Sequence, residues 1–128
     1  NKQIKKLPNF LKKRRENAKL FVNLFKSHDD FLIQKEIDKS SWFGFSLIIR
    51  PGSRLIRKDI INVLEKNKIE YRPIVTGNFA RNEVLKYFNY EIHKKLTNAN
   101  HLHDNGFFVG NSHENLSSNI KLLKKILS

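Results

Sequence analysis

A nine-residue apolar segment, Trp42-Phe-Gly-Phe-Ser-Leu-Ile-Ile-Arg50, constrains the fold of this chain more than any other feature. Its aromatic and β-branched residues favour a β-strand, and the segment is apolar enough to lie at the centre of a sheet. Pro51-Gly52-Ser53 breaks the strand. We expect neighbouring strands on its flanks and helices over its faces.

The rest of the chain provides these elements. From Leu7 to Phe25, apolar residues recur at three- and four-residue intervals, which is typical of an amphipathic helix, and Pro8 lies near its start or at a kink. Patterns of the same kind predict helices at about 57–67, 83–88, 97–105 and 116–127, an edge strand at 31–37, and strands at 69–75 and 106–111. The sequence therefore predicts an α+β fold, a small and mostly antiparallel sheet covered by helices.

Length and composition set further bounds. With 128 residues, 39% of them hydrophobic, the chain is long enough for one domain with a real core. It has no cysteine, which excludes disulfides, zinc–thiolate sites and iron–sulfur clusters within this segment and fits a cytoplasmic location. No apolar run approaches the roughly 20 residues of a membrane-spanning helix. Because Met is absent even at position 1, we expect a piece of a longer chain.

The net charge of +13 raises the question of a nucleic-acid or anionic-surface partner. Residues 1–26 hold nine of the 25 basic residues and only one Glu, so the excess is concentrated in the first helix. No recognisable nucleic-acid reader motif accompanies it, and we expect no nucleic-acid partner. A stand-alone basic module that binds nucleic acid or an anionic surface remains the alternative from another functional class.

The segment after the predicted strand 69–75 is the first place to look for a site. Thr76-Gly77-Asn78-Phe79 predicts a sharp turn, since Gly77 permits positive φ. The turn would gather Arg72, Asn78, Phe79 and Arg81 at a strand end, where a rigid scaffold positions polar groups. There are ordinary alternatives: Arg72 could pair with Glu70 or Glu91, and Asn78 could simply hold the turn through its own amide.

The histidines suggest a metal site only at first sight. His101, His103 and Asp104 carry suitable ligand atoms, but residues two apart on a helix point to different sides. We therefore expect no metal ion. His28 is expected in a surface loop.

Four ordered blocks carry a family resemblance: Ser41-Trp-Phe-Gly-Phe-Ser46, Arg72-Pro-Ile-Val-Thr-Gly-Asn-Phe79, Asn98-Ala99 and Asn105-Gly-Phe-Phe-Val-Gly-Asn111. Together they resemble the C-terminal domain of the DegT/DnrJ/StrS-type sugar aminotransferases, which bind pyridoxal phosphate (PLP) in the fold-type I, aspartate-aminotransferase fold. Gly77-Asn78-Phe79 after Arg72-Pro73 is most similar to the branch that removes a C3 hydroxyl, whose type acts on GDP-4-keto-6-deoxymannose. A sugar aminotransferase is the alternative within the family.

The resemblance implies an organisation and a set of partners. Residues 1–27 would form a connecting helix and 28–128 the small domain, with the large cofactor-binding domain absent. PLP or its amine form (PMP) would act as the electron sink, held by that large domain. No catalytic or cofactor-binding residue is therefore expected in this chain, which should not turn over alone. The implied partners are a nucleotide-linked 4-keto-6-deoxyhexose, an amino donor such as glutamate, and a second subunit of a homodimer. The pathway implied is deoxysugar synthesis for lipopolysaccharide.

The resemblance also implies that strand-end turns of this domain face the substrate. The residues predicted to bind it are Arg72, Asn78, Phe79, Arg81, Trp42 and Asn111. Arginine forks suit carboxylates and phosphates, and aromatic rings, Phe43 included, could line an apolar wall beside a sugar. Large aromatics in strands usually pack inward, so for Trp42 and Phe43 we favour a place in the core.

Overall fold

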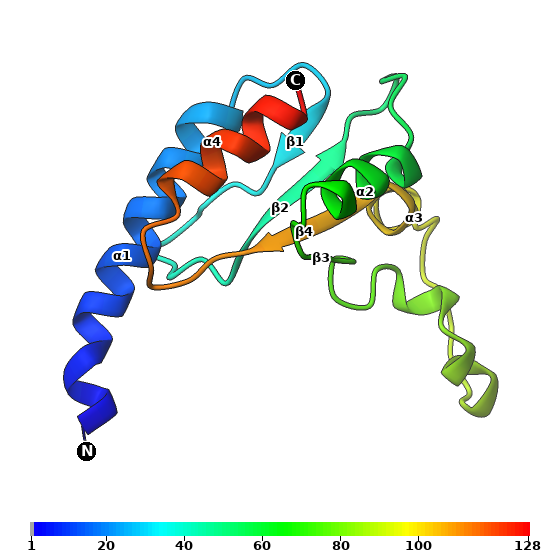
Figure 1. Ribbon diagram of the computed structural model, residues 1–128. Helices are drawn as coiled ribbons and strands as arrows, with labels where there is room; N and C mark the ends of the chain where they lie inside the picture. The colour runs from blue at the N-terminus through cyan, green and yellow to red at the C-terminus, as the bar shows by residue number, and fades with distance from the viewer. Residues whose placement is uncertain (1) are drawn as a thin grey trace.

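The computed structural model describes residues 2–128 and confirms the α+β prediction. One antiparallel sheet has the strand order β1-β2-β4-β3 (Figure 1). Its strands are β1 (Phe31–Ile33), β2 (Gly44–Ile49), β3 (Tyr71–Arg72) and β4 (Gly106–Gly110). The helices are α1 (Lys2–Phe25), α2 (Arg57–Lys66), α3 (Thr97–Asn105) and α4 (Ser117–Ile126), with 3-10 turns η1 (Phe79–Arg81) and η2 (Glu83–Tyr87).

The register determines which residues share a face. In β2 and β4, Leu47 lies opposite Phe107 and Ser46 lies opposite Phe108. Arg72 of β3 also lies opposite Phe108, from the other side of β4. Since side chains alternate along a strand, Leu47 and Phe107 belong to one face, whereas Ser46, Phe108 and Arg72 belong to the other.

The hydrophobic core lies on the first of these faces. Helices α1 and α4 run side by side over it (Figure 1). The Phe21 ring of α1 stacks on Phe45 of β2 at 4.5 Å and on Phe25 at 4.8 Å, and all three rings are fully buried. Each ring contributes about 1.5–3 kcal/mol by leaving water. The apolar stripe predicted for the first helix is therefore the face that α1 buries.

Helix α1 contains Pro8 within its second turn, and its first half is exposed and extends beyond the sheet (Figure 1). The apolar residues Ile4 and Leu7 of that half are exposed. None of the helices formed by residues 2–128 has both the length and the apolar character to cross a bilayer.

Two predicted strands are shorter in the structure. The prediction of a strand over 31–37 is wrong beyond Ile33, because the Gln34 side chain takes over the pairing with β2. Its Oε1 accepts the Ser46 N–H at 2.8 Å and its Nε2 donates to the Gly44 carbonyl at 3.3 Å. The prediction of a strand over 69–75 holds only for Tyr71–Arg72. Pro73 has no N–H to pair, and Val75 adopts φ +48°, which no strand residue does.

His28 lies in the loop between α1 and β1, as predicted, but the prediction that it lies at the surface is wrong. His28 is 7% exposed and lies between the rings of Phe25, at 5.7 Å, and Phe31, at 5.0 Å. Its Nδ1 accepts the Asp30 N–H at 3.2 Å. Burial, assisted by the charge of Lys124, lowers the pKa of His28.

The core prediction is confirmed for Trp42 and wrong for Phe43. Trp42 is 3% exposed, whereas Phe43 is 79% exposed. Trp42 adopts a left-handed backbone conformation with φ +51°, which reverses the alternation of side chains just before β2. The reversal sends Trp42 inward and Phe43 outward.

Residues 79–96, which we call the arm, project from the body of the domain between β3 and α3 (Figure 1). The arm carries the exposed apolar side chains of Phe79, Val84, Tyr87, Phe88, Tyr90 and Ile92. An exposed apolar surface of this kind often marks a contact with another part of a protein or with a partner.

Candidate functional site

A groove of 820 Å³ lies on the second face of the sheet, at the end away from α3. Helix α3 covers only the other end, where the Leu102 carbonyl packs against Gly106. The groove is lined by Phe43, Glu70, Tyr71, Arg72, Pro73, Val75, Thr76, Phe108, Gly110 and Asn111. The uncovered half of the sheet thus provides its floor, and the β3 edge with the following turn provides one wall.

Two glycines shape the floor of the groove. A Cβ on Gly44 would lie 2.7 Å from Cδ2 of Phe108, so Gly44 lets the Phe108 ring lie flat across the strand. A Cβ on Gly110 would meet no atom within 4 Å, so Gly110 keeps space open inside the groove. The Phe43 ring lies 5.8 Å from Phe108 at an interplanar angle of 55°, and the pair forms an apolar wall.

Arg72 supplies the positive charge of the groove. It is exposed, it shares the face of Phe108, and the other lining residues include no Lys or Arg. Among residues 2–128 it forms no ion pair, so pairing with Glu70 or Glu91 is not observed. A guanidinium beside two aromatic rings can bind a carboxylate or phosphate while the rings contact an apolar ligand face. Arg72, predicted from the sequence as a site residue, and Phe43, expected in the core, both line the groove.

The turn after β3 forms as predicted, with Gly77 at φ +62°. Asn78 is 5% exposed and holds the turn through its side chain. Its Oδ1 accepts the Ala80 N–H at 3.0 Å, and its Nδ2 donates to Oδ1 of Asn100 on α3 at 2.8 Å. The simple alternative for Asn78, an amide that holds its own turn, is therefore observed.

Neither Arg81 nor Phe79 lines the groove. Arg81 forms an exposed ion pair with Asp104 of α3 at 2.7 Å, and Phe79 is half exposed on the arm. Of the residues predicted around this turn, Arg72 lines the groove, whereas Asn78, Phe79 and Arg81 do not. Substrate binding by Asn78, Phe79 and Arg81 stays a prediction.

Asn111 and Trp42 belong to a buried polar network that the sequence did not reveal. Asn111 is 9% exposed, and its Nδ2 donates to the carbonyls of Trp42 at 3.0 Å and Arg14 at 3.1 Å. Its Oδ1 accepts from Nδ2 of Asn17 at 3.1 Å. The Asn111 amide therefore faces α1, although the residue also borders the groove.

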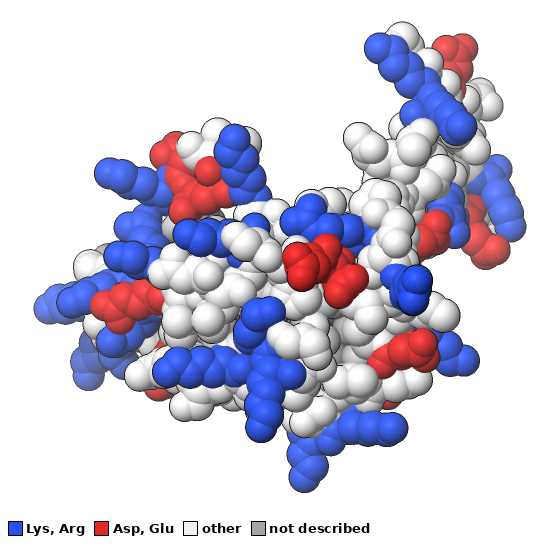
Figure 2. Space-filling view, turned by 90° about the horizontal axis from the view of Figure 1, so that it is seen from above, with Lys and Arg blue, Asp and Glu red and all other residues white. Residues whose placement is uncertain are grey.

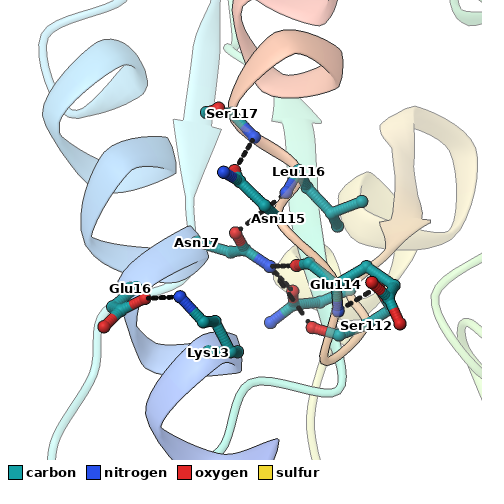
Figure 3. A network of polar contacts seen from close by, with 9 residues as sticks. Lys13, Glu16, Asn17, Ser112, Glu114, Asn115, Leu116 and Ser117 are labelled. Atoms are coloured by element: carbon teal, nitrogen blue, oxygen red, sulfur yellow. Dashed lines mark hydrogen bonds and ion pairs between the residues drawn. The ribbon is translucent and has the colours of Figure 1, made fainter.

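Asn17 is the hub of this network (Figure 3). Its Nδ2 also donates to the carbonyls of Ser112, at 3.2 Å, and Glu114, at 2.8 Å, and its Oδ1 accepts the Leu116 N–H at 3.1 Å. Asn17 is 5% exposed, on the buried face of α1. The one sign of the network in the sequence was a polar amide among the apolar residues of this helix face. Its partners lie more than ninety residues away and could not be named from the pattern.

The remaining charges do not gather in one patch on the face that Figure 2 shows. Lys and Arg lie on all sides of the view in Figure 2, and acidic side chains lie among them. His101 bonds to the Ile49 carbonyl at 2.8 Å and His103 to the Asn78 N–H at 3.1 Å, so the two rings are directed to different partners. In the described part of the chain, no three His, Cys, Asp or Glu residues are grouped to hold a metal ion.

Comparison with known proteins agrees with the family resemblance found in the sequence. The model of the DegT/DnrJ/EryC1/StrS aminotransferase family matches residues 1–119. The GDP-4-keto-6-deoxy-D-mannose 3-dehydratase of Escherichia coli O55:H7 is 48% identical over 126 residues, which are 98% of this chain and 32% of that enzyme.

Two crystal structures of GDP-4-keto-6-deoxymannose 3-dehydratase superpose closely, each with 48% identity, a TM-score of 0.96, and coverage of 99% of this chain and 33% of the other. One holds a trapped PLP–glutamate geminal diamine, and the other, a mutant, holds GDP-perosamine. This chain spans about a third of the length of these relatives. It belongs to the DegT/DnrJ/EryC1/StrS aminotransferase family.

Proposed function

We propose that this chain is the small domain of a PLP-dependent enzyme that removes the C3 hydroxyl of a nucleotide-linked 4-keto-6-deoxyhexose, in deoxysugar synthesis for lipopolysaccharide. The observation that carries the proposal is the 48% identity to a 3-dehydratase along 98% of the chain. Residues 1–27 would connect the domain to the cofactor-binding part of the protein. An aminotransferase of the same family is the alternative reaction.

The residues of this chain do not fit the role of a cofactor site. PLP enzymes commonly bind the cofactor through a Lys, with an Asp or Arg at the pyridine nitrogen. The groove contains no Lys and no Asp, and none of the lysines among residues 2–128 is buried. We therefore propose that the groups that hold PLP and move protons at the sugar belong to the rest of the protein.

The contribution of this chain is to bind and orient the substrates. Arg72 forms no ion pair among residues 2–128, although Glu70 also lines the groove. Its guanidinium is suited to the carboxylate of an amino donor such as glutamate, or to the diphosphate of the sugar nucleotide. The rings of Phe43 and Phe108 offer an apolar wall to a sugar face and exclude water from it. The open space over Gly110 leaves room for a ligand close to the backbone.

The arm would complete the assembly. Tyr87 is 84% exposed and Phe88 61% exposed, and such rings are stabilised when another surface covers them. We propose that the arm packs against the cofactor-binding part of the protein in a homodimer whose active sites lie at the subunit boundary.

Product analysis tests the proposed reaction. The complete protein, loaded with PLP and supplied with glutamate, should convert GDP-4-keto-6-deoxymannose into a product without oxygen at C3, detected by NMR and mass spectrometry. A product with an amino group at C4 and the C3 hydroxyl retained would favour the aminotransferase alternative. No conversion of the sugar nucleotide would refute both.

The role of Arg72 is tested separately. Arg72→Lys should raise the KM of glutamate or of the sugar nucleotide about tenfold, because an ammonium cannot replace a two-pronged guanidinium. Arg54→Lys is the matched control, since Arg54 is exposed and lies outside the groove. Equal KM values for the two variants would remove Arg72 from the site.

A further inference from the structure

We propose that Arg14 and Asn111 are positioning residues, which hold Trp42 in its left-handed backbone conformation and thereby turn Phe43 outward to form a wall of the groove. The use of that wall in substrate binding rests on the proposed function. The backbone arrangement itself is independent of it.

The Trp42 carbonyl is the point that both residues hold. It accepts a hydrogen bond from Nη2 of Arg14 at 2.6 Å and another from Nδ2 of Asn111 at 3.0 Å. The Trp42 N–H donates to Oγ of Ser40 at 2.9 Å. Both peptide groups that flank the Trp42 Cα are therefore fixed, although the residue lies in a loop before β2.

The Arg14 guanidinium engages three carbonyls at once. Besides Trp42, its Nε donates to Ser41 at 2.9 Å and its Nη1 to Asn111 at 3.3 Å. A planar fork with donors in fixed directions suits this arrangement, whereas a lysine presents a single point charge. Arg14 thus joins α1 to the loop before β2 and to the residue after β4.

A left-handed conformation is costly for tryptophan, because its Cβ crowds the following carbonyl oxygen. Such conformations persist where the surrounding structure holds them, and they cluster at functional positions. Trp42 has φ +51°, and its ring is anchored in the core beside Phe21 and Phe45, at 6.4 and 6.2 Å. Core packing fixes the side chain of Trp42, and the bonds from Arg14 and Asn111 fix its carbonyl group.

The consequence of the reversal appears at Phe43. In a regular strand, Phe43 would share the core face with Phe45, two residues later. Instead it is 79% exposed and lies beside Phe108 in the groove. Asn111 supports this position a second time, because its N–H donates to the Phe43 carbonyl at 3.3 Å.

The experiment uses the complete PLP-loaded protein with 4-fluorophenylalanine at position 43 and the variants Arg14→Gln and Arg14→Lys. Arg15→Gln is the matched control. Arg15 neighbours Arg14 on α1 and donates to the same loop, but to the carbonyls of Ser40 and Lys39, both at 3.1 Å, and not to Trp42. The ¹⁹F signal is recorded without substrate, so that it reports the position of the Phe43 ring whatever reaction the enzyme catalyses.

We expect Arg14→Gln and Arg14→Lys to shift or broaden the ¹⁹F signal and Arg15→Gln to leave it as in the wild type. In unlabelled protein, Arg14→Gln and Phe43→Ala should each raise the KM for GDP-4-keto-6-deoxymannose about tenfold with kcat nearly unchanged. The double variant should be no worse than either single one, because the two changes remove the same wall.

An unchanged ¹⁹F signal in both Arg14 variants would overturn the proposal, and so would additive effects in the double variant. Phe43 is exposed, so Phe43→Ala folds even if an Arg14 variant does not, and an unchanged KM in it would also count against the wall. If the wild type leaves the sugar nucleotide unconverted, the proposed function fails. The ¹⁹F comparison still shows whether Arg14 positions Phe43.

Discussion

His103 packs directly against Gly77, so closely that a Cβ on Gly77 would collide with Nδ1 of the His103 ring. The same Nδ1 accepts the Asn78 N–H at 3.1 Å. The contact joins the turn after β3 to α3, and with the Asn78–Asn100 bond it fixes the base of the arm.

Gly77→Ala should destabilise the domain by about 2 kcal/mol or more, because it adds a steric collision to the cost of φ +62° for an L-residue. Urea denaturation of the 128-residue chain measures this loss. Gly52→Ala is the control: Gly52 has φ +86° but open space around it, so that variant shows the conformational cost alone. Equal losses in the two variants would contradict the contact with His103.

Much of the fold could be predicted from periodicity. The stripe of α1 and the apolar segment of β2 identified the core, because each buries one face in a regular element. The prediction failed where one residue departs from regular geometry. The φ of Trp42 leaves no sequence signal, since Trp42 is not a glycine, and it decided the position of Phe43. The early end of β3 did have a signal, because Pro73 directly follows Arg72, and the left-handed Val75 then prevents the strand from resuming.

The site was predictable only in part, for a related reason. Arg72 was selected because a strand end followed by a turn is a common place for a site, and it lines the groove. Phe43 was expected in the core, and only the backbone reversal at Trp42 places it in the groove. The buried amides of Asn17 and Asn111 act through partners far away in the sequence, which only the folded chain brings together. The position of Asn17 among the apolar residues of α1 indicated a buried amide, but it could not identify the hydrogen-bond partners.

Asn17→Ala should destabilise the domain by about 3 kcal/mol, because it leaves the buried Asn111 amide and the partly buried Glu114 carbonyl and Leu116 N–H without their partner. Denaturant unfolding followed by circular dichroism measures the change. Asn23→Ala, an exposed position on the same helix, should lie within about 0.5 kcal/mol of the wild type. A loss no larger than that of the control would show that the network contributes little to stability.

The stability of the domain should depend on pH through His28. Burial lowers its pKa in the folded state, so the unfolded chain binds a proton more readily. This contribution to the free energy of unfolding is fully present above the unfolded pKa of about 6.5 and is lost as the pH falls from there through the lower folded pKa. Urea midpoints measured between pH 7.5 and 5 should therefore fall.

His28→Phe keeps a ring between Phe25 and Phe31 and should flatten that dependence. A variant whose urea midpoint falls with the same slope as the wild type would assign the pH effect to other groups.

The arm should stabilise the complete protein but not the isolated chain. Replacing both Tyr87 and Phe88 by Ser should leave the melting temperature of the 128-residue chain nearly unchanged, because both rings are exposed there. The same change should lower the melting temperature of the complete protein, where we propose that the rings are covered. Ile37→Ser, an exposed apolar position outside the arm, is the control and should affect neither. Equal melting temperatures for wild type and arm variant in the complete protein would refute the covered arm.

The central claim is that the groove between β3 and Phe43 receives the substrate of the complete enzyme. Gly110→Leu tests it most directly, because the new side chain would enter open space, with no atom within 4 Å of its Cβ, and would fill the groove while the fold remains intact. The measurement is the KM for GDP-4-keto-6-deoxymannose in the complete PLP-loaded protein, with the melting temperature recorded beside it. We predict a rise in KM of about tenfold or more at an unchanged melting temperature. An unchanged KM in a folded Gly110→Leu enzyme would contradict the claim.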